Sequence, residues 1–566
     1  MPTSSQSRGP LLLGAGVIAY LVIVLAFLSD KLVTRQYYLR QDAVGGIVLA
    51  AALLAAALLG ARGPRRSLPL SPPGWLPVLL LACLLVLALW GGTYWIMFDY
   101  PLTRDELMVG FDAEIFGSGK LAQPLAEQWR AFRPALAPDF LMPIEGNVAL
   151  VSNYMPGNAL MRLGMERLGD AALLNPLLAA VGLVAIWDTA RRLFADCAPA
   201  VWVVVAGYVL SAQILTNAMT SYAMTGHLAF NAVWLALFVR DKWWSHALAM
   251  AVGLWAMGLH QVVFHPLAVG AIILTLLAQG RWRLFAVYAV VYAAGLAGWM
   301  LYPGYVLGTV GAEAAAGGSK GLGDFIVQRV VPLLAAFNPY SLPLMMYNIL
   351  RFFVWNAAFC LPLLLCSVSA VLRHELLPLG LAGSLLVTTL AVVALMAYQG
   401  HGWGYRYWQA VLPAILLLTG YGFREWLGRD HRLATNAVLG LGIVTLAVMS
   451  FLFLAAHRFV APYDALTRLI DRQQAEFVIL ETDPPGTAID QVRNRADLSN
   501  RPLIFASTEL DPAQVRELCR RGSVTFVRKR QFALVPFGIS LVDGTRAYDS
   551  VERWLEGRPC WRAPVS

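Results

Sequence analysis

Charged side chains are scarce in this chain. Only 14% of the 566 residues are Asp, Glu, Lys or Arg, and 58% are apolar, whereas an ordinary soluble protein carries about 25% charged residues. This scarcity excludes a disordered chain and argues against a soluble enzyme of this size. Several apolar runs instead reach the roughly 20 residues that a membrane-spanning helix needs. The sequence therefore predicts an integral membrane protein.

Acidic residues are fewer than basic ones, which gives a formal net charge of +9. Such an excess can indicate nucleic-acid binding. Here the basic residues lie between apolar runs, where they orient a protein in the membrane. We therefore expect membrane lipids as partners and no nucleic acid.

Hydropathy predicts about thirteen membrane-spanning helices. They are expected near residues 11–29, 45–61, 75–97, 171–189, 199–217, 221–239, 245–259, 262–278, 284–303, 351–372, 376–397, 408–424 and 434–456. With a cytoplasmic N-terminus, basic residues concentrate on the inner side, and the short outer turns near 218–220 and 260–261 carry none. This orientation places the long polar segments on the outer face, so we expect the chemistry there.

The density of charge changes near His457. Residues 457–566 hold 30 of the 77 charged residues, which is typical of a water-exposed domain. A helix is expected from Asp511-Pro512, an N-cap followed by proline, to Gly522. Strands are expected at Glu476–Glu481, Pro502–Ala506 and Ser523–Val527. This pattern predicts a small α/β domain without a phosphate loop, a metal-ligand pattern or a nucleophile elbow.

The sequence thus predicts four parts. They are N-terminal transmembrane helices at 1–97, a first outer loop at 98–170, a transmembrane bundle at 171–456 with an outer loop near 304–350, and an extracytoplasmic α/β domain at 457–566. Cys519 and Cys560 are the only cysteines of that last domain. We expect them to form a disulfide in an oxidising compartment.

The first outer loop begins with a charged motif, Arg104-Asp105-Glu106, directly after the third expected span. One carboxylate can accept a proton while its neighbours tune its pKa, so the motif is a candidate general-base site. A solvated loop of mixed charge is the alternative interpretation. Downstream come Asp112-Ala113-Glu114 and Ser152-Asn153-Tyr154-Met155-Pro156-Gly157.

The Asp105-Glu106 pair followed by Tyr154-x-Pro156-Gly157 resembles the polyprenyl-phosphate-dependent glycosyltransferases of the GT-C class, in particular the protein O-mannosyltransferase and aminoarabinose transferase superfamily. The resemblance covers about 98–425. It implies a lipid-linked sugar donor whose phosphate is the leaving group, with Asp105 as general base and Glu106 as supporting carboxylate. Three expected spans precede the motif where many relatives have one, and the extra pair preserves its sidedness.

A phosphate leaving group needs positive charge or hydrogen-bond donors beside it. Arg406 is the candidate donor-phosphate ligand, in an outer turn whose rings are suited to a sugar or a lipid. His401, Tyr405 and Tyr407 of that turn are assigned to the substrate cavity. An interfacial aromatic belt with a snorkelling arginine is the alternative.

Further basic residues are weaker candidates for the phosphate. Lys320 lies in a Gly-rich stretch of the second long outer loop, and Arg130 and Arg133 lie in the first. The simpler interpretation is a flexible connector with a solvated lysine for Lys320, and surface charges for Arg130 and Arg133.

Tyr154, His227 and His260 are further candidates for the substrate cavity. Hydrogen bonding between helices would also explain His227, which lies within an expected span. His260 and His265 lack the spacing and partners of a zinc site, so no structural zinc is expected. The sequence indicates no cofactor and no divalent metal.

We interpret the chain as an all-α multi-spanning membrane bundle, similar to the GT-C class, with a small C-terminal α/β domain. The expected activity is inverting transfer of a sugar from a polyprenyl-phosphate donor to a hydroxyl of a glycan, lipid or protein acceptor. The expected location is the outer face of a bacterial inner membrane. A lipid or polysaccharide transporter or flippase, a polymerase of lipid-linked glycans, and a scaffold subunit are the alternatives.

Overall fold

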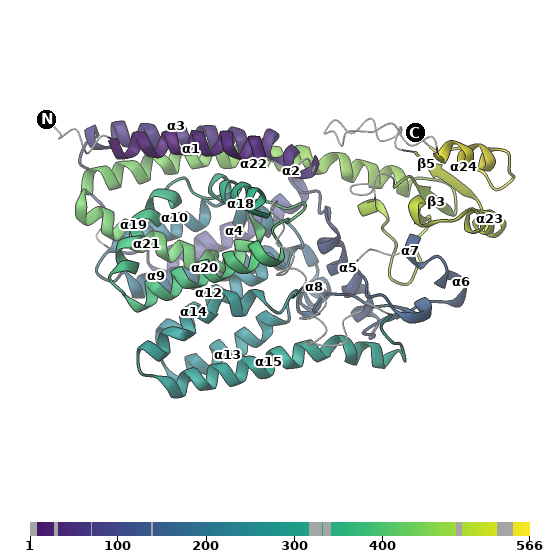
Figure 1. The fold of residues 1–566 in the computed structure, drawn as a ribbon, viewed down its shortest axis with the longest axis horizontal. Coiled ribbons are helices and arrows are strands. Elements are labelled where there is room, and N and C mark those ends of the chain that lie inside the picture. The colour runs from purple at the N-terminus through teal and green to yellow at the C-terminus, as the bar shows by residue number, and fades with distance from the viewer. Residues whose placement is uncertain are drawn as a thin grey trace. The chain divides into compact units, whose positions relative to one another are not determined.

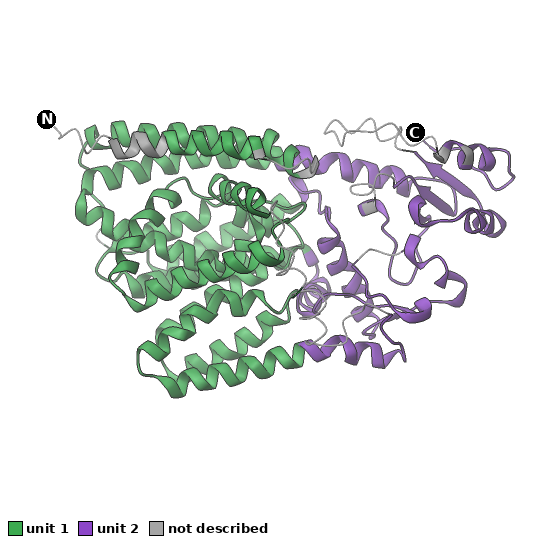
Figure 2. Ribbon diagram, viewed as in Figure 1, with its two compact units in different colours: residues 1–93, 172–299, 326–455 green, residues 94–171, 300–325, 456–566 purple. Residues whose placement is uncertain are grey.

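The computed structural model of this chain is mostly helical (Figure 1). It describes residues 8–27, 32–69, 71–136, 140–315, 331, 341–482, 489–528 and 547–565. Two compact units are present (Figure 2): unit 1 comprises residues 1–93, 172–299 and 326–455, and unit 2 comprises residues 94–171, 300–325 and 456–566.

Unit 1 is a bundle of apolar helices. Its elements are α1 (Arg8–Phe27), α2 (Leu32–Tyr37), the π-helix η1 (Tyr38–Asp42), α3 (Ala43–Leu59), α4 (Trp75–Trp95), α9 (Leu174–Leu193), α10 (Ala198–Val209), α11 (Ala212–Ala218), α12 (Met224–Arg240), α13 (Trp243–Met257), α14 (Phe264–Ala278), α15 (Trp282–Thr309), α18 (Ser341–Trp355), α19 (Cys360–Leu372), α20 (Leu376–Leu395), the 3-10 helix η6 (Arg406–Val411), α21 (Leu412–Arg429) and α22 (His431–Asp471). The ends of α4, α15 and α22 extend into unit 2.

Each expected span coincides with one of these helices or with a pair of them. Among the described residues, six helices are long and apolar enough to cross a membrane, and eight spans result if each of two bent pairs is one span. The expectation of a helical membrane protein is therefore confirmed, while the total of thirteen spans stays a prediction. Close packing between α19 and α21 depends on Gly422, where a Cβ atom would collide with the carbonyl oxygen of Leu363.

Two expected spans are not continuous helices. Residues 199–217 fall in α10 and α11, which are bent by 48° relative to each other. Residues 351–372 fall in α18 and α19, which are bent by 106° relative to each other, so the prediction of a single helix is wrong in both cases.

In the break between α18 and α19, Ser211 donates a hydrogen bond to Asn356 at 2.7 Å, and the Ala358 amide donates to the Thr445 hydroxyl at 2.9 Å. Side chains that are distant in sequence thus satisfy the polar groups of the break. The hydropathy of residues 351–372 does not predict these contacts.

Unit 2 contains the strands and shorter helices. Its elements are α5 (Arg104–Gly117), β1 (Gln123–Pro124), α6 (Glu127–Arg130), α7 (Arg133–Leu136), β2 (Ala149–Leu150), α8 (Gly157–Leu168), β3 (Phe477–Leu480), β4 (Leu503–Ala506), α23 (Pro512–Arg521), β5 (Val524–Val527) and α24 (Ala547–Glu556). Strands β4, β3 and β5 form a parallel sheet in that order. The three strands and α23 confirm the prediction for this segment, including the N-cap at Asp511, whose carboxylate accepts from the Gln514 amide at 2.7 Å.

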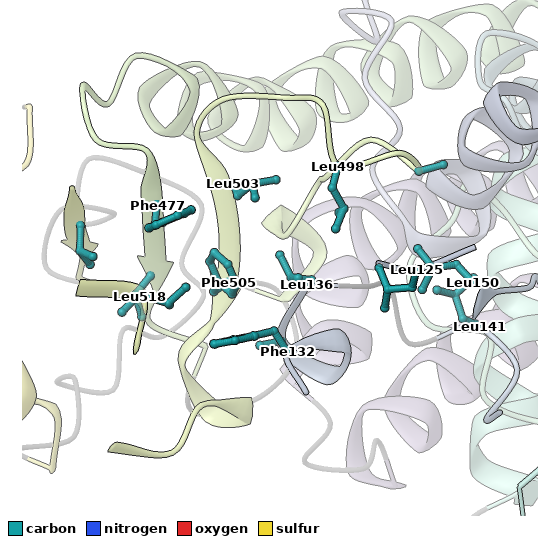
Figure 3. Close-up of a cluster of buried hydrophobic side chains, with 14 of the residues drawn as sticks. Leu125, Phe132, Leu136, Leu141, Leu150, Phe477, Leu498, Leu503, Phe505 and Leu518 are labelled. Atoms are coloured by element: carbon teal, nitrogen blue, oxygen red, sulfur yellow. The ribbon is translucent and has the colours of Figure 1, made fainter. Parts of the chain in front are cut away.

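The loop at 98–170 and the C-terminal strands share one hydrophobic core. Figure 3 shows Phe132 and Leu136 from the loop beside Leu503 and Phe505 of β4. The rings of Phe132 and Phe505 lie 5.8 Å apart between centroids and meet edge to face, which is a favourable aromatic geometry. The loop at 98–170 therefore folds together with a segment more than 300 residues away in sequence.

The structure pairs Cys519 of α23 with Cys560, with Cα atoms 5.3 Å apart. Replacing both with serine should destabilise unit 2 by about 2–4 kcal/mol, because a cross-link over 41 residues restricts the unfolded chain. Thermal unfolding of the double variant measures this loss, and Cys197→Ser, a free cysteine of unit 1, is the control. Mass spectrometry of non-reduced peptides should find the bridge, whereas two free thiols in protein from its native compartment would refute it.

Candidate functional site

The acidic motif of the first loop opens helix α5. Thr103 is the N-cap, and its hydroxyl accepts a hydrogen bond from the Glu106 amide at 3.4 Å. In return the Glu106 carboxylate accepts from the Thr103 amide at 3.2 Å, which completes a capping box. Glu106 is only 2% exposed. Its carboxylate thus fixes the start of the helix, where negative charge is also favoured by the helix dipole.

Asp105 has different surroundings from Glu106. It is half-buried, and the Tyr154 hydroxyl donates a hydrogen bond of 2.5 Å to its Oδ1 atom. The Tyr154 ring packs against Phe140, and its amide donates to the Ser152 hydroxyl at 3.1 Å. The structure therefore brings together the two residues that the sequence places in one motif 49 residues apart.

Asp112 is a second acid on the same face of α5. Seven residues separate it from Asp105, which is about two helical turns. It is buried, at 3% exposure, and hydrogen-bonds with Ser152. Burial raises the pKa of Asp112 to about 8, and the bond with Ser152 opposes that rise. The segment 152–154 thus contacts both acids along one face of the helix.

Residues of the C-terminal segment contact the chain at the start of α5 and just before it. Arg104 donates to Asp490 at 2.7 Å, and Gln491 donates to the Tyr100 hydroxyl at 2.7 Å. The guanidinium of Arg493 lies 4.1 Å from the centre of the Tyr100 ring. The residues that lead into α5 are therefore held in place by residues 490–493, which lie far away in sequence.

Two basic residues of the loop bond to its own backbone. Arg130 donates to the Leu125 carbonyl at 3.3 Å, and Arg133 donates to the Met142 carbonyl at 2.6 Å. Burial lowers the pKa of Arg133. These contacts give both residues a role in shaping the loop, and their expected phosphate binding stays a prediction. Lys320 lies outside the described residues.

In unit 1, the turn at 398–407 folds tightly on itself. Arg406 donates to the Gln399 carbonyl at 2.6 Å, and the Arg406 amide donates to the Gln399 side chain at 3.1 Å. Gly404 has a φ of +64°, and a Cβ atom there would collide with the Gln213 side chain. The glycines of this turn therefore allow the close approach that buries Arg406 to 7% exposure.

Aromatic rings surround Arg406. Its guanidinium carbon lies 5.2 Å from the Tyr222 ring centre and 5.3 Å from that of Tyr407, within the range of cation–π contact. Tyr407 stacks on Phe264 at 6.1 Å between centroids, and Phe264 meets the His227 ring at 5.2 Å. We call these five residues the ring cluster.

Three other candidates belong to unit 1. His401 and Tyr405 lie in the 398–407 turn, and His260 lies between α13 and α14. The His401 ring contacts the Tyr37 hydroxyl at 3.2 Å, and the pKa of His401 is lowered to about 4 by burial and by the charges of Arg406 and Arg351. Tyr405 is fully buried and donates to the Met345 sulfur at 3.4 Å. His260 is 7% exposed.

Sequence reasoning did not identify two of the aromatic residues that make these contacts. Tyr222 and Phe264 belong to the ring cluster, yet apolar context makes them indistinguishable from core aromatics. In sequence, Asp112 is only one of several acids downstream of the motif, and its burial in the structure distinguishes it. Within the described part of the chain, no group of three or more His, Cys, Asp and Glu side chains is arranged to hold a metal ion.

No family model and no curated protein matches this chain. The solved structures that are similar to it include two of ArnT. One is ArnT from Cupriavidus metallidurans bound to undecaprenyl phosphate, with a TM-score of 0.49 and 13% identity over 74% of this chain and 85% of that chain. The other is ArnT from the same organism in the apo state, with a TM-score of 0.47 and 14% identity over 74% and 84%. A likeness at this level does not transfer an activity.

Proposed function

We propose that this chain is an integral membrane glycosyltransferase of the GT-C type. It transfers a sugar from a polyprenyl phosphate to an acceptor hydroxyl at the outer face of the membrane. The observation that carries the proposal is Asp105, a half-buried carboxylate at the start of α5 that accepts a short hydrogen bond from Tyr154. The orientation follows from the charge pattern of the loops, with the N-terminus cytoplasmic and the C-terminal segment outside.

Asp105 acts as the general base of a single displacement. It takes the proton of the acceptor hydroxyl while the acceptor oxygen bonds to the anomeric carbon. The bond from that carbon to the phosphate oxygen breaks, and its electron pair leaves with the polyprenyl phosphate. One displacement inverts the anomeric carbon and needs no enzyme nucleophile. Tyr154 holds the carboxylate in place, and Glu106 supports it by fixing the helix start.

Arg406 binds the donor phosphate. A guanidinium offers several donors in one plane and stays charged, which suits it to phosphate. Tyr407, the half-buried ring of the ring cluster, supplies an aromatic face on which a sugar or the first lipid units can pack. No residue of this proposal requires a metal or an organic cofactor.

Binding of the lipid tests the substrate class directly. Native mass spectrometry of the purified protein should detect a bound polyprenyl phosphate, and a polyprenol of the same length should compete weakly for it. The phosphate provides the charge-assisted contacts that the alcohol lacks. Equal binding of the two lipids would contradict a phosphate site.

Replacing Arg406 with alanine should raise the Kd for polyprenyl phosphate by roughly 10- to 100-fold, because a charge-assisted contact of roughly 1.5–3 kcal/mol is lost. The KM for the acceptor should change little. Arg406→Lys should recover part of the affinity, since it keeps the charge and loses the planar geometry. Arg424→Ala is the matched control, because Arg424 pairs with Glu375 at 3.5 Å in a segment expected on the inner side. Unchanged donor titration for Arg406→Ala would refute this role.

A further inference from the structure

A charged pair lies buried inside unit 1. Asp42 is 0% exposed and Arg351 is 1% exposed, and Arg351 Nε lies 3.6 Å from Asp42 Oδ2. The carboxylate of Asp42 also accepts hydrogen bonds from the Tyr347 hydroxyl at 2.6 Å and from the Trp355 indole at 2.8 Å. Both oxygens of the acid are thus held by residues of α18.

Asp42 lies where the helical geometry of the chain is irregular. Asp42 is the last residue of the π-helix η1, which joins α2 to α3. The continuous helix Thr34–Arg62 is apolar enough to span a membrane. Short π-helical segments inside longer helices occur frequently at functional sites, and ionisable residues inside a span are rarely retained for stability alone.

Arg351 connects this pair to the turn that carries Arg406. It donates to the Gly402 carbonyl at 2.6 Å, and its guanidinium carbon lies 4.1 Å from the Tyr37 ring centre. Tyr37 in turn contacts the His401 ring at 3.2 Å. Two consecutive residues of the turn are therefore held by the pair or by its direct neighbour.

The last contact in this series involves Arg406 itself. Its side chain packs against the backbone of Gly402, since a Cβ atom on Gly402 would lie 3.1 Å from the Arg406 Cδ atom. Tyr222, whose ring lies beneath the Arg406 guanidinium, also donates to the His401 carbonyl at 3.3 Å. A shift of residues 401–402 would therefore displace both the guanidinium and the ring on which it rests.

We propose that Asp42 and Arg351 are positioning residues that fix the 398–407 turn in the conformation in which Arg406 binds the donor phosphate. The proposal rests on the proposed function of Arg406. Asp42 sets the orientation of Arg351, Arg351 holds the Gly402 carbonyl, and Gly402 sets the place of the Arg406 side chain. Neither residue touches the substrate.

The test uses the full-length protein with Asp42→Asn and Arg351→Gln combined, which removes both charges together and leaves no unpaired ion. Hydrogen exchange of the 398–407 amides should become faster by about ten-fold or more, because the bond to the Gly402 carbonyl is lost. The Kd for polyprenyl phosphate should rise by about ten-fold, the scale of a lost contact to a charged group, while the KM for the acceptor stays the same.

A matched control is available in the same unit. Asp188 pairs with Arg240 at 2.7 Å and is 6% exposed. Asp188→Asn should leave exchange in the turn and the Kd for polyprenyl phosphate at wild-type values, even where it lowers thermal stability. If the double variant does not fold, Tyr37→Phe keeps the pair and removes only the contact with His401. Faster exchange at 401–402 and weaker lipid binding are then expected of Tyr37→Phe.

Wild-type exchange and wild-type Kd in a folded variant would overturn the positioning role. Faster exchange with an unchanged Kd would overturn it as well, because the turn would then not control lipid binding. Failure of the wild-type protein to bind polyprenyl phosphate is a different result. It refutes the proposed function and with it the donor that the turn is proposed to serve.

Discussion

Replacing Asp105 with asparagine is expected to lower kcat by about 10²–10⁴-fold, the usual scale for the loss of a general base. Asparagine keeps the size of the side chain and an oxygen that can accept the bond from Tyr154. It removes the form that takes a proton. Folding and donor binding should stay near wild type, so the loss should appear in kcat and equally in kcat/KM for the acceptor.

Glu106→Gln is the matched control for Asp105→Asn. Both changes replace a carboxylate with an amide at neighbouring positions. Glutamine also serves in a capping box, so the start of α5 should survive and the rate should fall much less. A wild-type transfer rate for Asp105→Asn would move the base to Glu106 or Asp112. If none of the three mattered, a transporter or scaffold function would become the better account.

Asp112→Asn should stabilise the protein by an amount that grows with pH. The pKa of Asp112 is raised by burial to about 8 in the folded chain, whereas an exposed aspartate has a pKa of about 3.9. Between these values the unfolded state has lost the proton and the folded state keeps it. The unfolded state therefore binds fewer protons, and stability falls as pH rises from about 4 to about 8.

Asparagine has no proton to lose, so the gain from Asp112→Asn should be absent near pH 4. It should reach on the order of a few kcal/mol near pH 8. Thermal unfolding in detergent at pH 5, 6.5 and 8 measures the trend. Glu114→Gln is the control, because that carboxylate lies on the same helix and is 40% exposed. A gain that is equal at all three pH values would show that Asp112 is not a buried acid with a raised pKa.

Local patterns in the sequence predict much of the fold. Asp511, Pro512 and Gly522 mark the ends of α23 because caps and proline act on their own neighbours. The strands β3, β4 and β5 follow from short apolar runs, and the helices of unit 1 from longer ones. All of these signals lie within a few residues of the element that they specify.

Contacts between distant segments were not predictable in the same way. Phe132 packs against Phe505, and Asn356 bonds with Ser211 in the break between α18 and α19. Neither contact leaves a periodic pattern in the sequence. The union of the first loop with the C-terminal strands and the bend at 356–359 therefore appear only in the folded chain.

The same distinction between local signals and long-range contacts applies to the candidate site. The motif of Asp105, Glu106 and Tyr154 is visible in sequence because its order resembles a known family. Glu106 caps α5 through a local pattern, a threonine followed three residues later by a glutamate, so its structural role is visible in the sequence. The burial of Asp112 depends on how α5 packs. Asp42 lies just before the span that the sequence predicts at 45–61, so its pairing with Arg351 could not be expected.

The central claim is transfer from a polyprenyl-phosphate sugar. Its most direct test incubates the purified protein with a panel of such donors and candidate acceptors, and follows the release of polyprenyl phosphate by mass spectrometry. We expect release with at least one donor by wild-type protein, and release about 10²–10⁴-fold slower by Asp105→Asn at equal lipid binding. No release from any donor, or release at the same rate by both proteins, would contradict the account.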